Sequence, residues 1–265
     1  MTEKSLQKQN STDVKARSLW GDAFRRFKKN KMAVISLIFL LLLALVGVIT
    51  LVIDVVTDNS IYDQLVTSQN LTQRFETPSS AHPLGLDEFG RDILLRIIWG
   101  TRYSLFMSIV AIVAAGLVGT VIGAIAGYYG GKVDNVIMRL MDIILSLPYM
   151  LLAIAIVAAL GPGLVNVLIS IAIGYVPEFA RIVRASVMTI REREFVEAAK
   201  AVGASDKSII FQQILPNAMA PLIVEVTMAI AGAILSIAGL SFLGLGIQPP
   251  TPEWGAMLTN ARGYI

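Results

Sequence analysis

The sequence from Glu194 to Pro216, EFVEAAKAVGASDKSIIFQQILP, is polar and charged and lies between long hydrophobic runs. Helical spacing places three apolar residues on one face of a first short helix: Phe195, Ala199 and Val202. Gly203 then interrupts the pattern as a left-handed helix end does, and Ser205 is placed to N-cap a second short helix. On one side that helix would carry three apolar residues: Phe211, Ile214 and Leu215. Pro216 suits the first turn of the next long helix, so we expect a helix, a tight turn and a helix at a membrane surface.

Two functions fit this stretch. One is a helix-turn-helix that reads DNA, and the other is a pair of short helices that docks a partner protein. A DNA-reading helix needs basic residues for the phosphates, but Lys207 is the one basic residue between Ser205 and Pro216. The apolar runs on both sides and this lack of positive charge favour protein docking.

The composition of the 265-residue chain is that of a membrane protein. Hydrophobic residues make up 55% of the chain and charged residues 15%, whereas about a quarter of a soluble domain is charged. The net charge of +3 is too small to indicate nucleic acid as a partner. The chain has no cysteine and a single histidine, His82, which excludes disulfides, thiol catalysis and a metal site built from several such ligands.

The first residues, Met1 to Lys31, are polar and basic. Trp20, Phe24 and Phe27 recur at helical spacing between arginines and lysines, which predicts an amphipathic helix on an anionic cytoplasmic leaflet. A cleavable signal peptide does not fit, because the charged region is too long and no small-residue cleavage site follows the apolar run. The positive bias before the first apolar run, and its absence after that run, predict a cytoplasmic N-terminus.

Apolar runs predict five transmembrane helices. They are Met32–Ile53, Tyr103–Gly127, Ile143–Leu160, a run that begins with Leu164–Val176, and Ala218–Ile247. In the second run Gly119, Gly123 and Gly127 repeat at four-residue spacing, which predicts that another helix approaches closely there. Pro148 is expected to kink the third run, and Pro177 to lie near the inner end of the fourth.

Three stretches, taken in order, resemble one family of membrane proteins. Glu197-Ala198-Ala199, then Gly203, then Leu215-Pro216 looks like the EAA loop of ABC-importer permease subunits. The stretch His82–Asp92, HPLGLDEFGRD, resembles the segment before the second span of peptide-permease C subunits. A third resembles the same group near its last external loop: Ser241–Gly246, Gln248–Pro250 and Trp254-Gly255. From about Trp20 onward, the chain is similar to C-type permeases of the dipeptide and oligopeptide family.

This resemblance implies an all-α, polytopic helical membrane protein like a type I ABC importer, with five transmembrane helices present and a sixth expected beyond the C-terminus. We therefore expect a multi-pass protein of the cell (plasma or inner) membrane that is truncated or is the ordered part of a longer chain. Three parts are expected: a basic cytoplasmic segment, the first transmembrane helix with an external loop, and a permease core with a coupling loop. The basic segment covers residues 1–31, and the first transmembrane helix with its external loop covers 32–101. The permease core covers 102–265 and contains the coupling loop at 194–217.

The resemblance also implies partners and a substrate. The subunit would translocate di- or oligopeptides delivered by an external substrate-binding protein, beside a homologous second permease subunit and in contact with membrane lipid. Six residues would couple it to nucleotide-binding ATPase subunits: Glu197, Ala198, Ala199, Gly203, Leu215 and Pro216. Those subunits would bind ATP and Mg, so this chain would hold no cofactor and no metal and would not be an enzyme. Nickel or another small solute is the alternative substrate, because related permeases share these motifs.

The sequence contains no Walker A motif, no G-x-S-x-G motif and no metal cluster, so nothing in it predicts catalysis. One acid, Glu225, lies deep in an apolar run, where an unpaired carboxylate is costly. It is expected either to line a substrate pathway and meet the amine of a passing peptide, or to make a structural hydrogen bond. Ser236, Ala238 and Gly239 depart from the family's expected Glu-Ala-Ser arrangement, which leaves the substrate open. A membrane-anchored DNA-binding regulator is the alternative from another class.

Overall fold

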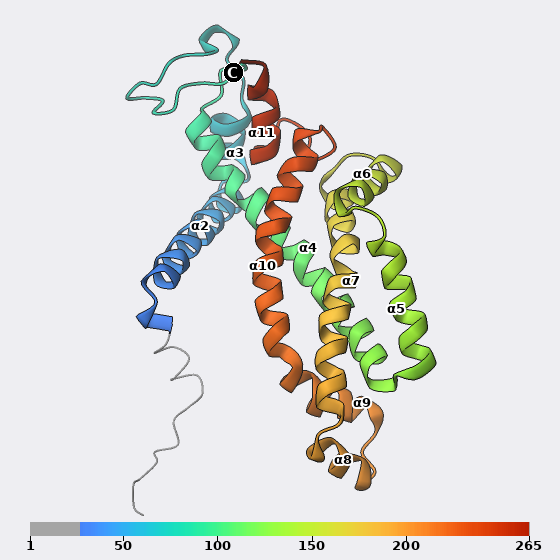
Figure 1. The fold of residues 1–265 in the computed structure, drawn as a ribbon. Helices are drawn as coiled ribbons and strands as arrows, with labels where there is room; N and C mark the ends of the chain where they lie inside the picture. The colour runs from blue at the N-terminus through green and yellow to red at the C-terminus, as the bar shows by residue number, and fades with distance from the viewer. Residues whose placement is uncertain (1–26, 265) are drawn as a thin grey trace, which may run out of the picture. The chain divides into compact units, whose positions relative to one another are not determined.

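The computed structural model describes residues 27–264, which form helices and connecting loops (Figure 1). The longer helices are α2 (Lys31–Val56), α4 (Ile93–Tyr129), α5 (Gly131–Leu145), α6 (Tyr149–Leu160), α7 (Leu164–Arg191) and α10 (Leu215–Phe242). The shorter ones are α3 (Ser60–Tyr62), η2 (Asp63–Thr67), η3 (Leu71–Gln73), α8 (Glu194–Ala201), α9 (Asp206–Ser208), η4 (Ile209–Ile214), α11 (Trp254–Ala261) and η5 (Arg262–Tyr264). The chain divides into two units, Met1–Leu45 and Val46–Ile265. The amphipathic helix predicted around Trp20 and Phe24 lies outside the described residues.

Within the described residues, four helices are long and apolar enough to cross a membrane. They are α2, α4, α7 and a continuous helix, Asp206–Phe242, that comprises α9, η4 and α10. A fifth crossing results if α5 and α6 together form one span. α2 has no charged residue from Met32 to Ile53 and exposes most of its side chains, as a helix surrounded by lipid does. These spans agree with the predicted fold class.

The third predicted span, Ile143–Leu160, is wrong as a single helix. α5 ends at Leu145, α6 begins at Tyr149, and the two are bent by 84°. Pro148 has no N–H to donate and disfavours a helical conformation at the residue before it, so the chain turns here instead of only kinking.

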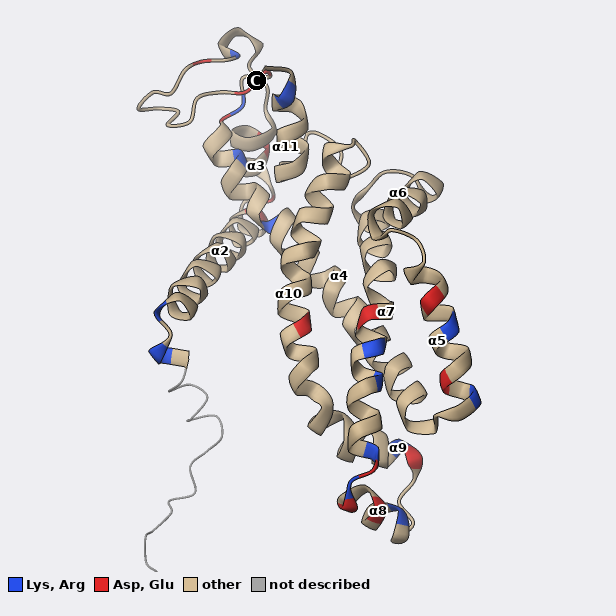
Figure 2. Cartoon of the chain, viewed as in Figure 1, with Lys and Arg blue, Asp and Glu red and all other residues tan. Residues whose placement is uncertain are grey.

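α7 continues beyond the predicted inner end of the fourth span. Pro177 lies inside the helix and is buried. Further along, two arginines pair with α5: Arg184 forms an ion pair with Asp134, and Nη2 of Arg181 lies 2.9 Å from Oδ1 of Asp142. Figure 2 shows charged residues on α5, on the second half of α7 and around α8 and α9. These arginines therefore belong to a helix paired with α5, and the loop itself begins after α7.

α4, α7 and α10 lie side by side and form the core of the second unit, and the largest interface is between α4 and α7 (Figure 1). The close approach predicted from the glycine spacing is confirmed. A Cβ atom added at Gly123 would clash with the carbonyl of Ala180, and one at Gly119 would lie 2.6 Å from the Cβ of Phe179. Gly127 packs against α7 in the same way. Glycine thus lets the two backbones touch.

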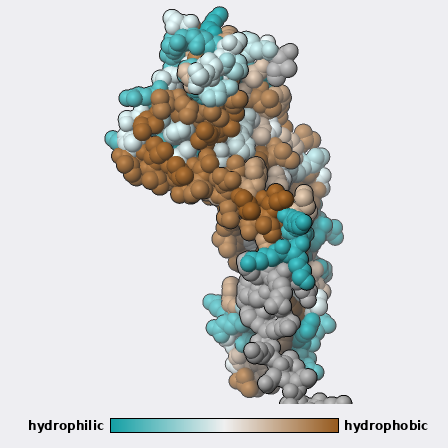
Figure 3. Space-filling model, turned by 90° about the vertical axis from the view of Figure 1, so that its left-hand side faces the viewer, coloured by the Kyte–Doolittle hydropathy of each residue, from teal (hydrophilic) through white to brown (hydrophobic). Residues whose placement is uncertain are grey.

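Many large apolar side chains of the described helices face outward. On the face drawn in Figure 3, brown apolar atoms form a broad area bordered by hydrophilic residues. A broad exposed apolar area is rare on a soluble monomer, whereas in a bilayer such an area contacts lipid tails that are equally apolar. The outward surface therefore fits helices embedded in a membrane.

Candidate functional site

The stretch between α7 and α10 forms a folded loop (Figure 1). α8 ends in a turn where Gly203 has a φ of 79°, and nothing lies within 4 Å of the position of its missing Cβ. The Ser205 side chain accepts a hydrogen bond from the N–H of Ser208 at 3.4 Å and so caps α9. The predicted glycine turn and serine cap are confirmed.

The second short helix is not separate from the next span, contrary to the prediction. α9, η4 and α10 form one continuous helix, and Pro216 lies in the first turn of α10. η4 is a π-helical segment, whose wider turn accommodates a proline that would clash with the preceding turn of a regular helix. A displacement of the loop would therefore pass directly into α10.

The apolar residues of the loop divide into a buried and an exposed set. The buried set holds α8 against the helix that follows: Val196, Ile209, Ile210, Ile214 and Leu215. Phe195 is 40% exposed, Phe211 is 55% exposed and Val202 is 83% exposed. Phe195 and Val202 therefore belong to the outward surface of the loop. Phe211 does not share the buried side of Ile214 and Leu215, where the sequence had placed it.

Polar contacts fix the loop to the C-terminal end of α4. The hydroxyl of Tyr128 donates to Oδ1 of Asp206 at 2.7 Å, and the Lys200 ammonium lies 5.5 Å from the centre of the Tyr128 ring. Nη1 of Arg191, at the end of α7, donates to the carbonyls of Gly127 and Tyr128 at 3.0 and 3.1 Å. The loop is therefore joined to α4, α7 and α10 together.

The six residues predicted to couple to an ATPase lie in this loop but differ in exposure. The four exposed residues are Glu197, Ala198, Gly203 and Pro216. Ala199 is half-buried, and Leu215 is buried. The N-cap of α8 is Arg193, whose side chain makes no capping hydrogen bond, and Glu197 lies in the first turn of the helix. Because Leu215 belongs to the buried stem, it cannot present its side chain to a partner.

Glu225 is half-buried on α10 and interacts electrostatically with Glu178 and Tyr175 of α7. The Tyr175 ring lies edge-on to Tyr149 of α6, with 5.1 Å between ring centres. Glu178 directly follows Pro177 in the sequence, near the predicted inner end of the fourth span, and nothing in the sequence indicates that it would face Glu225. In the described part of the chain, no group of three or more His, Cys, Asp or Glu residues could hold a metal ion.

Comparison with known proteins decides the class. Residues 119–265 match the family described as the binding-protein-dependent transport system inner membrane component. This chain belongs to that family of transport permeases. Residues 18–78 also match the N-terminal TM domain of oligopeptide transport permease C. The permease is thus a multi-pass inner membrane protein with a role in transport, and the predicted family is confirmed.

Relatives with known names are similar over most of the permease. The dipeptide transport system permease protein DppC of Alkalihalophilus pseudofirmus is 47% identical over 94% of this chain and 79% of its own length. The glutathione transport system permease protein GsiD of Pectobacterium atrosepticum is 42% identical over 94% of this chain and 81% of its own length. An inward-facing structure of the MetNI methionine ABC transporter matches with a TM-score of 0.55 and 20% identity, covering 65% of this chain and 82% of the solved one. That structure supports the fold of an ABC-importer permease.

A buried ion pair joins the C-terminal end of α2 to α4 in the second unit of the permease. Asp54 is 4% exposed and forms an ion pair with Arg102, and the Trp99 indole N–H donates to Oδ1 of Asp54 at 3.0 Å. Nη2 of Arg102 donates to the Tyr103 hydroxyl at 3.0 Å, and the guanidinium lies 5.1 Å from the centre of the Tyr62 ring. Burial raises the pKa of the Tyr62 hydroxyl, which lies beside this pair. An acid at the end of an apolar run gave no sign of this network in the sequence.

A second buried acid fixes α11. The carboxylate of Glu253, which is 0% exposed, accepts hydrogen bonds from the N–H groups of Gly255 and Ala256 at 2.9 Å each. It also accepts one from the Ser104 hydroxyl of α4 at 3.3 Å. An acid just before a short apolar helix is a recognisable cap, but the sequence could not show that it also holds α11 to α4.

Proposed function

We propose that this permease subunit imports di- or oligopeptides as part of a transporter that hydrolyses ATP on separate subunits. An external binding protein would deliver the peptide, a homologous second permease subunit would complete the pathway, and the ATPase subunits would bind ATP and Mg. The relatives support a peptide substrate, because they are named for dipeptide and glutathione transport and glutathione is itself a peptide.

The observation that carries the proposal is the exposed surface of α8 and its turn. Phe195 and Val202 present apolar side chains, while the small residues Ala198 and Gly203 leave room for a partner to approach. Exposed apolar residues of this kind, surrounded by charge, are typical of protein interfaces. Glu197 beside them is free to pair with a basic residue of an ATPase subunit.

The buried stem makes this surface suitable for transmitting motion. α8 packs on η4 through Val196, η4 continues into α10, and Tyr128 and Arg191 tie the loop to α4 and α7. Closure of the ATPase subunits would therefore move these helices together and change access to the transport pathway.

We expect Gly203→Asp to reduce ATP-driven uptake by about tenfold or more, because the loss of one central interface position costs on the order of 2 kcal/mol. Asp tolerates a left-handed backbone, so the change acts mainly through its charge and bulk. Gly131→Asp is the matched control, because Gly131 also has a positive φ, of 53°, and also has nothing within 4 Å. The measurement is peptide uptake and ATPase co-purification from membranes. Equal behaviour of the two variants would rule out coupling through this loop.

We also propose that the N-terminus and the α8–α9 loop lie in the cytoplasm and that the loop around Leu84 lies outside. The chain has no cysteine, so single cysteines can report the side of the membrane. Lys207 and Leu84 are both exposed. Lys207→Cys should react with a membrane-impermeant maleimide only after the cells are permeabilised, whereas Leu84→Cys should react in intact cells. The reverse labelling pattern would invert the proposed topology.

Glu225 is proposed to face the substrate pathway and to attract the amine of a passing peptide, because an acid half-buried beside another acid needs a positive partner. Glu225→Gln should slow the uptake of peptides with a free amino terminus by roughly fivefold, equivalent to about 1 kcal/mol. N-acetylated peptides should be unaffected, and Thr227→Val, an exposed position on the same helix, serves as control. Unchanged uptake of every peptide class would show that Glu225 is structural.

A further inference from the structure

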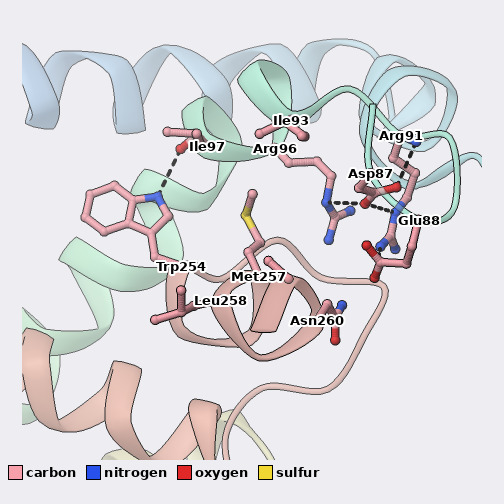
Figure 4. Close-up of a pocket in the computed structure, with 11 residues that line it drawn as sticks. Asp87, Glu88, Arg91, Ile93, Arg96, Ile97, Trp254, Met257, Leu258 and Asn260 are labelled. Atoms are coloured by element: carbon pink, nitrogen blue, oxygen red, sulfur yellow. Dashed lines mark hydrogen bonds and ion pairs between the residues drawn. The ribbon is translucent and has the colours of Figure 1, made fainter. Parts of the chain in front are cut away.

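The segment before α4, the first turns of α4, and α11 line an open pocket of about 410 Å³ (Figure 4). Its wall is apolar: Ile93, Ile97, Met257 and Leu258. Trp254 closes one side, and its indole N–H donates to the carbonyl of Ile97 at 3.1 Å. Pockets that hold small ligands have volumes of roughly 300 to 1,000 Å³, so this one is large enough for a short peptide.

The opposite end of the pocket carries an arginine with unused hydrogen-bond donors. Arg96 is 2% exposed, and its Nη1 donates to the carbonyls of Val66 and Pro250 at 2.9 and 3.1 Å. Its Nε is buried without a hydrogen bond, and the carboxylate of Asp87 is 3.6 Å away. That same carboxylate oxygen already accepts a hydrogen bond from Nε of Arg91 at 2.7 Å. Because this Nε has no accessible surface, a further acceptor would reach the guanidinium through Nη2, which makes no hydrogen bond to the described residues.

A carboxylate with free acceptor capacity lies at the same end. The Glu88 side chain is 14% exposed, and one of its oxygens lies 3.9 Å from Nη2 of Arg91, beyond hydrogen-bond distance. Figure 4 shows Asp87, Glu88, Arg91 and Arg96 together, across the pocket from the Trp254 ring. These four formal charges cancel, so the pocket favours neither a simple anion nor a simple cation. A ligand that carries both charges matches it.

We propose that this pocket binds a zwitterionic short peptide with an apolar side chain. The peptide carboxylate accepts hydrogen bonds from Arg96, its ammonium group faces Glu88, and its side chain packs against Met257, Leu258 and Trp254. The inference rests on the proposed function, because it takes peptides as the substrate. It adds a site outside the membrane core where the permease holds the peptide before translocation.

The first test measures binding to the transporter complex purified from membranes, without ATP and without the soluble binding protein. By titration calorimetry, Leu-Leu should bind about tenfold tighter or more than N-acetyl-Leu-Leu-amide, which lacks both charges. Leu258→Trp fills the pocket and should remove this binding. Leu243→Trp is the control, because Leu243 is 54% exposed, Leu258 is 53% exposed, and only Leu258 lines the pocket.

The second test separates recognition from a structural role. Glu88→Gln should abolish the preference for a free amino terminus and keep the preference for a free carboxyl terminus. Arg96→Gln should do the opposite, and if that variant does not fold, Glu88→Gln and Leu258→Trp still decide the question. A purely structural role for these residues would not exchange the preference between the two ends of a peptide.

The outcomes distinguish failure of the pocket proposal from failure of the proposed import function. If the wild-type complex imports peptides and Leu258→Trp binds Leu-Leu as tightly as the wild type, the pocket inference is overturned and the function stands. If no peptide is imported, the proposed import function is wrong. The calorimetric titration with Leu-Leu then decides alone whether the pocket binds a peptide. Release of a co-purifying subunit by Leu258→Trp, with peptide binding unchanged, would show that a protein occupies the pocket and would also overturn the inference.

Discussion

Asp54→Ala should lower the free energy of unfolding of this permease by about 3 to 5 kcal/mol, which is the usual cost of removing one partner of a buried ion pair. The Arg102 side chain is only 11% exposed, so its charge would remain buried without a counter-ion. The Trp99 indole N–H would lose its acceptor as well. The measurement is thermal unfolding of the protein in detergent, followed by size-exclusion chromatography with fluorescence detection.

The exposed pair on α5 and α7 provides the control. The Arg181 and Asp142 side chains are 55% and 51% exposed, so Asp142→Ala should cost about 1 kcal/mol or less. A double variant, Asp54→Leu with Arg102→Met, should recover much of the loss, because removing both charges also removes the cost of burying them. If Asp54→Ala melted at the same temperature as Asp142→Ala, the buried network would contribute no more than a surface pair.

Local chemistry explains what could be predicted from the sequence. An uncharged run such as Met32–Ile53 must be helical in a bilayer, because only a helix or a closed barrel satisfies its backbone hydrogen bonds. The turn at Gly203 and the cap at Ser205 follow from the conformational freedom of glycine and the acceptor of serine. These features depend on neighbouring residues alone, so no tertiary information was needed.

Which distant segments contact one another could not be predicted in this way. The pairing of Asp54 with Arg102 and the approach of Glu178 to Glu225 depend on how the helices cross. The joining of α9 to α10 was missed because Pro216 normally marks a helix start, and a π-helical segment removes that constraint. The proposed coupling and pathway residues stay predictions until the variants are measured.

The close contact of α4 with α7 gives the second large effect. Gly123→Ala should destabilise the permease by about 1 to 3 kcal/mol, as overpacking of a well-filled interior does. The added Cβ would clash with the carbonyl of Ala180, and backbone cannot turn aside as the end of a flexible side chain can. The two helices would have to separate along an interface that also includes Gly119 and Gly127.

Gly116→Ala, on the same helix, is the control for Gly123→Ala. The same added Cβ at Gly116 would meet only Cγ2 of Val226, at an ordinary 3.7 Å. Because alanine favours a helix over glycine by about 1 kcal/mol, this variant should be neutral or slightly more stable. A melting temperature that falls for Gly123→Ala and not for Gly116→Ala would assign the loss to the α4–α7 contact. If both fell equally, the cost would come from any added methyl group in α4, and glycine would not be required for close packing.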